Sequence, residues 1–249
     1  MKGRSRSSSI RTKRSSGAEK KWTKDGVLRE LEALADPRVR EKMAYFGVNV
    51  PKAHGISAPV LHALARHIGK DHALAEQLWA SGIHEARILA TLIGEPQKVT
   101  SEQMDRWAGD FNSWDVVDTA CRYLYVFAAP AWRKADAWSR RPEEFVKRAA
   151  FSLMAYLSYL DKQSPDARFA RLLRAIERES DDERNFVRKA VNWALRNVGK
   201  RNLRLNRQAI RAAERIQLRG SRVARWIAAD ALRELKSNAV QKRLRRKQI

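Results

Sequence analysis

The 249-residue sequence has a single cysteine, Cys121, and so cannot form an intrachain disulfide. A lone thiol fits a reducing compartment, and we expect a cytoplasmic protein. No stretch reaches the roughly 18 apolar residues of a membrane-spanning helix. The basic N-terminal segment also lacks the apolar run of a signal peptide. We therefore expect no membrane partner.

Motifs of metal and nucleotide chemistry are scarce as well. Histidines occur only before residue 85, at His54, His62, His67, His72 and His84. His62 and His67 are five residues apart, a poor spacing for one helix face, and His84-Glu85 lacks the second histidine of a zinc-binding helix. The sequence has no glycine-rich phosphate loop and no serine or cysteine in a nucleophile motif. We expect no metal and no cofactor.

Acidic residues are few relative to basic ones. The chain has 51 Lys and Arg against 28 Asp and Glu, a net charge of +23, which far exceeds what solubility requires. Such an excess predicts a polyanionic partner, and nucleic acid is the first candidate. Both ends are strongly basic, yet residues 25–235 still carry a net charge of +9. The folded body is therefore expected to have a basic face of its own.

The composition divides the chain into three parts. Residues 1–21 are dominated by Ser, Arg, Lys and Gly and are predicted to be a disordered basic tail. Residues 22–236 form the predicted folded domain, and residues 237–249 a basic C-terminal tail. From Lys24 onward, apolar residues recur at spacings of three and four without sustained strand-type alternation, which predicts an all-α fold.

Internal similarity gives the predicted architecture. Phe145–Ala149 recurs 41 positions later as Phe186–Ala190, and Ala194–Arg196 recurs 37 positions later as Ala231–Arg233. Periods near 40 are typical of HEAT-like helical repeats, which stack into a curved solenoid. The second helix of each pair would line the concave face. Because Lys or Arg recurs near the start of these helices, we expect a concave basic groove that suits a duplex.

Trp114 and Asp118 are the first candidates for chemistry. Ser113 can act as the N-cap of a helix on which Trp114 and Asp118, four residues apart, share one face. One interpretation is structural: Trp114 fills the core and Asp118 pairs with Arg122 at the same spacing. The other interpretation is an active site in which an aromatic ring and a carboxylate point together.

Trp193 and Arg148 also leave two interpretations open. Trp193 departs from its repeat counterpart Ser152, which indicates either core filling or a special site. Arg148 is either a solvated helix residue or a phosphate clamp. Together the four residues suit the departure of a cationic base from deoxyribose. Asp118 would stabilise the oxocarbenium sugar and hold the attacking water, while the two tryptophans would flank the sugar and the positively charged lesion.

Several motifs in order resemble the AlkD-like DNA alkylation repair enzymes over roughly residues 25–236. The motifs are Met43–Val48, His84–Arg87, Ser113–Asp115 with Asp118, Phe145–Ala150 and Arg188–Arg196. The resemblance implies a HEAT-like fold and removal of N3- and N7-alkylated purines. It places the catalytic Trp and Asp on Trp114 and Asp118, the phosphate-contacting Arg on Arg148 and a second lesion-site Trp on Trp193. Because such enzymes leave the lesion stacked in the duplex, a deep pocket is not required.

We therefore predict a monomeric, nucleoid-associated alkylpurine DNA glycosylase whose partner is double-stranded DNA with alkylated bases. Further DNA-binding residues are predicted at Lys147, Arg188, Lys189, Lys200 and Arg201. A lysine nucleophile would need a lowered pKa, and nothing in the sequence around these lysines indicates burial, so the enzyme is expected to be monofunctional and to leave an abasic site.

Two alternatives remain. One is a noncatalytic HEAT-like scaffold that binds DNA or branched nucleic acid. The other is a protein-interaction solenoid, which leaves the charge unexplained. A scaffold has no need for a carboxylate that faces a polyanion, so Asp118 favours the enzyme.

Overall fold

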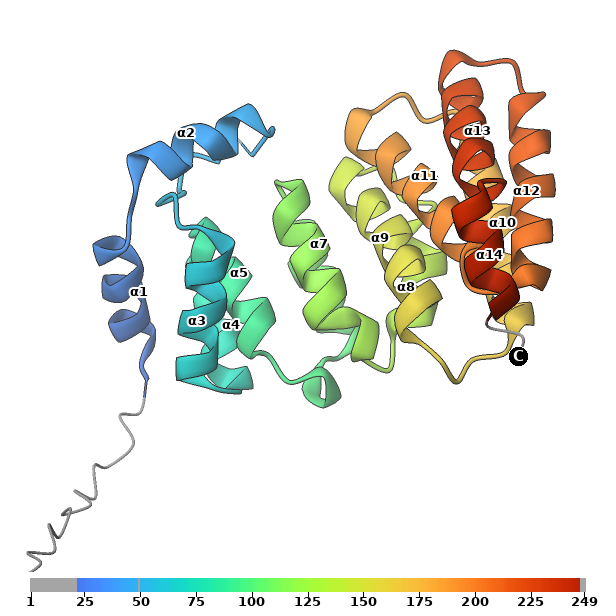
Figure 1. The fold of residues 1–249 in the computed structure, drawn as a ribbon. Coiled ribbons are helices and arrows are strands. Elements are labelled where there is room, and N and C mark those ends of the chain that lie inside the picture. Colours follow the sequence, from blue (N-terminus) through green and yellow to red (C-terminus); the bar gives the residue numbers. More distant parts are fainter. Residues whose placement is uncertain (1–21, 49, 247–249) are drawn as a thin grey trace, which may run out of the picture.

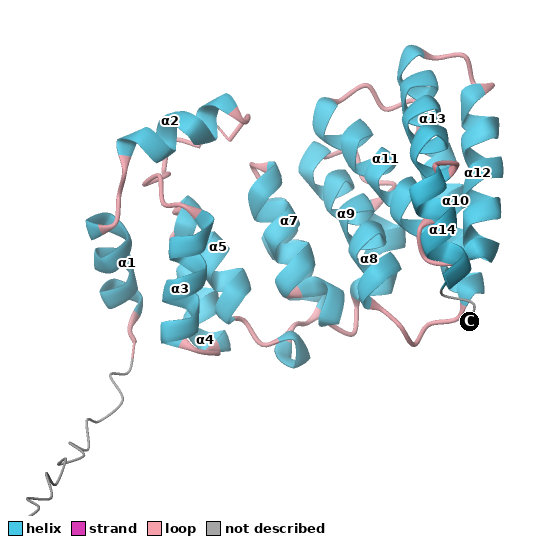
Figure 2. Ribbon diagram, viewed as in Figure 1, coloured by secondary structure: helices cyan, strands magenta, loops and turns pink. Residues whose placement is uncertain are grey.

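The computed structural model of the chain describes residues 22–48 and 50–246, and every regular element within these ranges is a helix (Figure 2). The predicted disorder of residues 1–21 lies outside the described residues. The elements are α1 (Lys24–Ala33), α2 (Pro37–Tyr45), α3 (Ala58–Ile68), α4 (His72–Ala80), α5 (His84–Ile93), η1 (Pro96–Lys98), α6 (Ser101–Gly109), α7 (Trp114–Tyr123), η2 (Tyr125–Phe127), α8 (Ala131–Trp138), α9 (Glu144–Leu160), α10 (Asp166–Arg178), α11 (Asn185–Gly199), α12 (Leu203–Gln217), α13 (Arg222–Leu235) and α14 (Asn238–Arg246).

The helices form the predicted stack of HEAT-like repeats. Helices α5, α7, α9, α11 and α13 pack side by side in that order and make an inner row (Figure 1). Outer helices α4, α8 and α12 pack against the inner helices that follow them in sequence. The sequence repeat has a direct structural counterpart, because Phe145 and Phe186 are the second residues of α9 and α11 and their rings lie 5.5 Å apart.

Small buried residues let the inner helices approach closely. Among the helices that the structure describes, α9 and α11 share the most extensive contact. Ala149 and Ala150 of α9 and Ala190 and Ala194 of α11 are all buried, so backbone can approach backbone with few intervening side-chain atoms. This packing fixes the relative position of the two helices that carry Arg148 and Trp193.

The buried Glu85 fixes the loop that leads from α2 into α3. Its carboxylate accepts hydrogen bonds from the backbone N–H groups of His54, Gly55 and Ile56 at 2.9, 2.7 and 3.3 Å. Gly55 has φ +83°, and a Cβ there would lie 2.3 Å from the carbonyl oxygen of Asp36, so only glycine fits. The His84-Glu85 dipeptide, considered above as a fragment of a zinc motif, thus has a structural role through Glu85.

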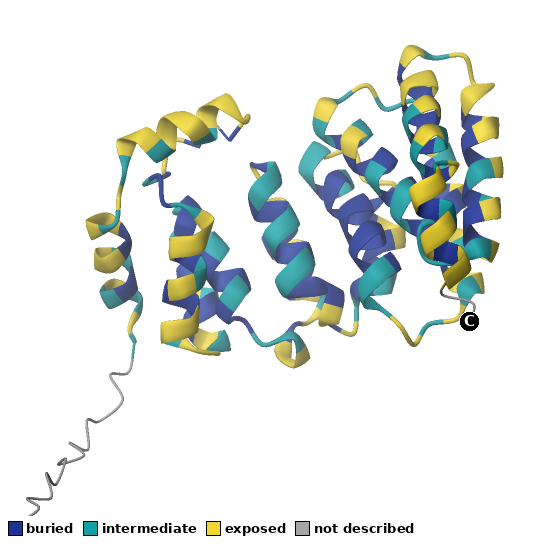
Figure 3. Cartoon of the chain, in the orientation of Figure 1, coloured by how far each residue is buried: buried dark blue, intermediate teal, exposed yellow. Residues whose placement is uncertain are grey.

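Helix α2 is the most exposed of the helices near the inner row. None of its residues is buried, in contrast to the largely buried inner row (Figure 3). Its C-terminal end approaches the N-terminal end of α7 (Figure 1). Gly47, just after α2, has φ +80°, and a Cβ there would lie 3.3 Å from the ring of Phe186 on α11. The end of α2 therefore reaches across the inner row.

The C-terminal segment differs from the predicted tail. The sequence predicts the end of the domain at residue 236, but α14 continues from Asn238 to Arg246 and packs on α12 and α13. Val240 and Leu244, one helical turn apart, are buried, and the Gln241 amide donates to Asn206 Oδ1 at 3.0 Å. The density of basic residues concealed this short apolar stripe, which attaches the segment to the folded body.

Candidate functional site

A cavity of about 480 Å³ opens between α7, α9 and α11 next to the end of α2, and the first turns of α7 and α11 contribute to it. Its lining combines aromatic rings with charged groups: Phe46, Trp114, Asp118, Arg148, Tyr156, Phe186, Lys189, Ala190 and Trp193. The four side chains singled out for chemistry therefore meet in one place, although they come from three helices. Helix N-termini carry partial positive charge, which favours an anionic ligand.

Trp114 is the first residue of α7, and Ser113 stands at its N-cap position. Ser113 thus occupies the predicted N-cap position, but its side chain makes no capping hydrogen bond to the helix backbone. The indole Nε1 of Trp114 donates to the carbonyl oxygen of Phe46 at 3.0 Å. Because this hydrogen bond ties the ring to the end of α2, Trp114 forms a fixed wall of the cavity.

Asp118 lies one turn further along α7 and makes three hydrogen bonds. Arg148 donates from Nε to Oδ1 at 3.2 Å and from Nη2 to Oδ2 at 2.7 Å, and Ser152 Oγ donates to Oδ1 at 2.7 Å. The interpretation that paired Asp118 with Arg122 is wrong, since Arg122 Nη1 donates to the hydroxyl of Tyr159 at 2.5 Å. Oδ1 accepts from two groups and Oδ2 from one, so Oδ2 keeps the greater capacity to accept from a water in the cavity.

Burial raises the pKa of the Asp118 carboxyl, and the charge and hydrogen bonds of Arg148 and Ser152 act against that rise. Asp115, three residues earlier on α7, behaves in the opposite way. Burial also acts to raise its pKa, but the hydrogen bond and charge of His84 outweigh burial and hold the pKa below its ordinary value. Two neighbouring carboxyls whose pKa values shift in opposite directions differ in how readily they hold a proton, which suits different chemical roles.

The structure rejects one interpretation of Arg148. Its side chain is only 8% exposed, so it is not a solvated helix residue. Besides the two hydrogen bonds to Asp118, Nη1 donates to the carbonyl oxygen of Phe186 at 2.9 Å. The guanidinium also lies 5.9 and 6.0 Å from the ring centroids of Trp114 and Phe186. Arg148 therefore joins α7, α9 and α11 at the centre of the site.

Trp193 and Tyr156 line the same cavity as Trp114. Their rings meet edge to face, with centroids 4.9 Å apart, and Trp193 is half-buried. Tyr156 lines the cavity and Ser152 contacts Asp118, and the sequence prediction of the site includes neither. The sequence signal was the spacing of four from Arg148 to Ser152 to Tyr156 on α9, which places all three on one helix face.

The remaining basic residues predicted to bind DNA divide into three groups. Lys189 is exposed and lines the cavity, while the adjacent Arg188 lies 5.6 Å from the ring centroid of Trp226. Lys147 is not brought to the site, because its ammonium pairs with Glu179 at 2.5 Å. Lys200 and Arg201 line another cavity at the far end of α11.

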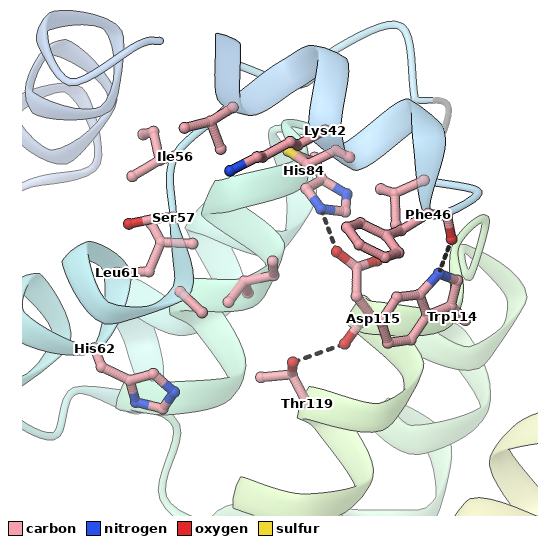
Figure 4. A pocket seen from close by; sticks show the side chains of 15 residues that line it. Lys42, Phe46, Ile56, Ser57, Leu61, His62, His84, Trp114, Asp115 and Thr119 are labelled. Atoms are coloured by element: carbon pink, nitrogen blue, oxygen red, sulfur yellow. Dashed lines mark hydrogen bonds and ion pairs between the residues drawn. The ribbon is translucent and has the colours of Figure 1, made fainter.

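A larger cavity, of about 570 Å³, lies on the other side of Trp114 and Phe46. Figure 4 shows His84 and Asp115 facing each other there, and their atoms Nε2 and Oδ2 are 2.9 Å apart. Most of the remaining lining is apolar, as at Ile56 and Leu61. The pairing with Asp115 uses only Nε2 of His84, and its buried Nδ1 has no hydrogen-bond partner among the described residues. This cavity shares Phe46 and Trp114 with the first one, but its lining is more apolar and it does not contain Asp118, Arg148 or Trp193.

The described part of the chain contains neither a metal-binding cluster nor a membrane-spanning helix. Among residues 22–48 and 50–246, no three His, Cys, Asp or Glu side chains are grouped so that they could hold a metal ion. Within the same residues, every helix is too short or too polar to span a bilayer.

Comparisons with known proteins agree with this architecture. The sequence profile of a family described as DNA alkylation repair enzyme matches residues 27–235. No curated protein sequence matches the chain. The chain is similar in fold to a solved structure described as a new family of proteins related to the HEAT-like repeat DNA glycosylases with affinity for branched DNA structures. That match has a TM-score of 0.67 and 22% identity, and it covers 78% of this chain and 83% of the other.

Proposed function

The chain belongs to the DNA alkylation repair enzyme family, and from this premise we propose that it is a monofunctional DNA glycosylase for N3- and N7-alkylated purines in duplex DNA. The observation that carries the proposal is the position of Asp118. Its half-buried carboxylate lines a cavity walled by Trp114 and Trp193, within a protein of net charge +23. A carboxylate at such a point opposes binding of a polyanion, so its benefit is expected in the reaction itself.

The proposed chemistry is hydrolysis of the N-glycosidic bond. The bond between C1′ and the purine nitrogen breaks, and its electron pair neutralises the cationic base. The sugar then develops oxocarbenium character, which the Asp118 carboxylate stabilises. A water held by Oδ2 attacks C1′ and gives its proton to Asp118. The product is an abasic site in an otherwise intact strand.

The aromatic walls favour the charged lesion over a normal base. Trp114 and Trp193 both line the cavity, and a cation near the face of such a ring gains about 0.5 to 2 kcal/mol. Lys189 is exposed at the same cavity and is placed to contact a phosphate. Arg148 has three of its five N–H groups committed to Asp118 and Phe186, so its remaining donors are available to a backbone phosphate.

The proposal is tested by comparing charged and neutral lesions in the same duplex. Chromatography of freed bases should detect release of 7-methylguanine and 3-methyladenine, whereas a neutral lesion such as hypoxanthine should remain attached. Gel analysis should show no strand break before alkali treatment. Equal release of neutral and cationic bases would exclude the mechanism, because neutral bases need protonation that the site does not supply.

The pH dependence of release follows from the state of Asp118. Its carboxyl must be ionised to act, and burial raises its pKa. We expect the single-turnover rate to be constant near neutral pH and to fall in acid, with a midpoint above the ordinary carboxyl value of about 3.8. Ser152→Ala removes one hydrogen bond to the ionised form and should move this midpoint upward. A rate that is unaffected by acid down to pH 4, after subtraction of spontaneous release, would contradict the assignment.

Removal of the Trp193 ring should slow release without unfolding the protein. The ring is half-buried and rests on Tyr156, so Trp193→Ala should reduce the release rate by about 2- to 30-fold, the equivalent of a cation–π contact. Trp193→Phe should keep part of the activity. Phe127→Ala, at an exposed aromatic outside this cavity, is the matched control and should release bases at the wild-type rate. An equal loss in both Ala variants would indicate a general effect on stability.

The second candidate function is a noncatalytic scaffold for branched DNA. It is favoured by the affinity for branched DNA structures ascribed to the protein of similar fold. In this case the ion pair between Asp118 and Arg148 would serve only to hold α7 and α9 together. The scaffold predicts tighter binding to a four-way junction than to a linear duplex and no release of any base.

A further inference from the structure

A second cationic cavity lies at the opposite end of α9 and α11. It has a volume of about 230 Å³ and is lined by Lys162, Lys200, Arg201 and Arg243 together with polar groups. None of the described residues that line it is acidic. Arg243 comes from α14, so the helix found at the C-terminal end of the domain completes this cavity.

The four basic side chains are held differently. Arg201 is fixed, because its Nη1 donates to the carbonyl oxygens of Ser158 and Asp161 at 3.1 and 2.5 Å. Lys200 is held by Glu234 at 2.8 Å. Lys162 and Arg243 are exposed and make no ion pair with any residue that the structure describes. The cavity thus combines a fixed basic floor with two basic groups that remain available to an anion.

The same helix faces carry both cavities. On α9, Arg148 and Tyr156 line the first cavity and Tyr159 lines the second. On α11, Trp193 lines the first cavity and Asn197, one turn later, lines the second. A ligand that lies along this face can therefore touch both cavities at once.

The basic groups of the two cavities are spaced like the strands of a duplex, although the nearest walls of the cavities, Trp193 and Asn197, are only one turn apart. Lys189 at the first cavity and Lys200 at the second are eleven residues apart along α11. Eleven residues separate Arg148 from Tyr159, which corresponds to about 16 Å along the axis of α9. The major groove of B-DNA is about 12 Å wide between its bordering backbones, before the phosphate groups themselves are counted. One strand at the first cavity would thus place the other strand near the second.

We propose that the cavity of Lys162, Lys200, Arg201 and Arg243 binds a backbone phosphate of the strand opposite the one that enters the site of Asp118. This assignment rests on the proposed function for the identity of the ligand, but it concerns binding alone. The protein would recognise duplex DNA by holding both strands, with basic groups at the two ends of α9 and α11.

The first test removes the two available basic groups. The variant Lys162→Gln/Arg243→Gln should bind an undamaged duplex more weakly, and its plot of log affinity against log salt should be shallower by about one, the loss of one phosphate contact. Its affinity for a single strand of the same sequence should be unchanged. Arg171→Gln/Arg174→Gln, which removes two exposed basic residues from the outer helix α10, is the control and should keep the wild-type slope for the duplex.

The second test assigns the strand. Neutral methylphosphonate linkages in the strand opposite the lesion should weaken binding by the wild type and have little effect on the Gln variant. The same linkages in the lesion strand should weaken both proteins equally. An unchanged salt slope in the Gln variant, or no effect of neutral linkages opposite the lesion, would overturn the proposal. Because both tests measure binding and not base release, these results stand whether or not the protein releases bases.

Discussion

Asp118→Asn is expected to reduce base release by about 100-fold or more while duplex affinity stays at or slightly above the wild-type value. The amide has the shape of the carboxylate, and its single oxygen can still accept from Arg148 Nε and Ser152 Oγ, although it loses the hydrogen bond that Arg148 Nη2 donates to Oδ2, so the cavity should remain assembled. It has no charge to stabilise the oxocarbenium sugar and cannot take a proton from the attacking water. Loss of a negative charge that faces the polyanion cannot weaken electrostatic attraction.

A matched control separates this effect from the loss of any ion pair. Asp105 is also a paired carboxylate, held by Lys134 at 2.5 Å and by the indole of Trp138, but it lies outside the cavity. Asp105→Asn should release bases at the wild-type rate, measured on folded protein with thermal unfolding as a check. Comparable losses in the two variants would show that Asp118 matters only for stability.

Arg148→Ala should be the most destabilising substitution in the site, lowering the free energy of unfolding by about 3 kcal/mol. It leaves the half-buried Asp118 carboxylate without its bidentate partner and removes the hydrogen bond to the carbonyl oxygen of Phe186. The value lies at the low end for a broken buried pair because Asp118 can take up a proton instead of remaining charged. Denaturant unfolding followed by circular dichroism measures it.

The destabilisation should depend on pH in a defined direction. Burial already raises the pKa of Asp118, and loss of Arg148 removes a group that opposes this rise. A carboxyl whose pKa is higher in the folded state than in the unfolded state favours folding when protonated. The loss should therefore be smallest below the ordinary carboxyl pKa and should grow as pH rises through the raised pKa. In the double variant with Asp118→Asn it should become nearly independent of pH, and a persistent dependence would implicate another group.

The repeat architecture could be predicted because it is written in local patterns. Apolar residues at spacings of three and four define the helices, and the recurrence of Phe145 at Phe186 defines the unit that stacks. Such patterns depend on neighbours along the chain. The C-terminal helix escaped prediction because its apolar stripe has only Val240 and Leu244 among many basic residues.

The partners of the site residues could not be predicted from spacing. Asp118 pairs with Arg148, 30 positions away, and not with Arg122 on its own helix, because the packing of α7 on α9 brings the distant guanidinium closer. Lys147 and Arg148 are adjacent in sequence, yet a rotation of about 100° per residue sends them to different surroundings. One pairs with Glu179 and the other lines the cavity, a difference that composition alone does not contain.

The most direct test of the central claim is a single experiment on methylated duplex DNA with the wild type and Asp118→Asn in parallel. Freed 7-methylguanine and 3-methyladenine are quantified by chromatography, and DNA binding is measured in the same samples. We predict release by the wild type, its loss in the variant, and equal binding by both. Binding without release by the wild type, or equal release by the two proteins, would contradict the assignment of a glycosylase that acts through Asp118.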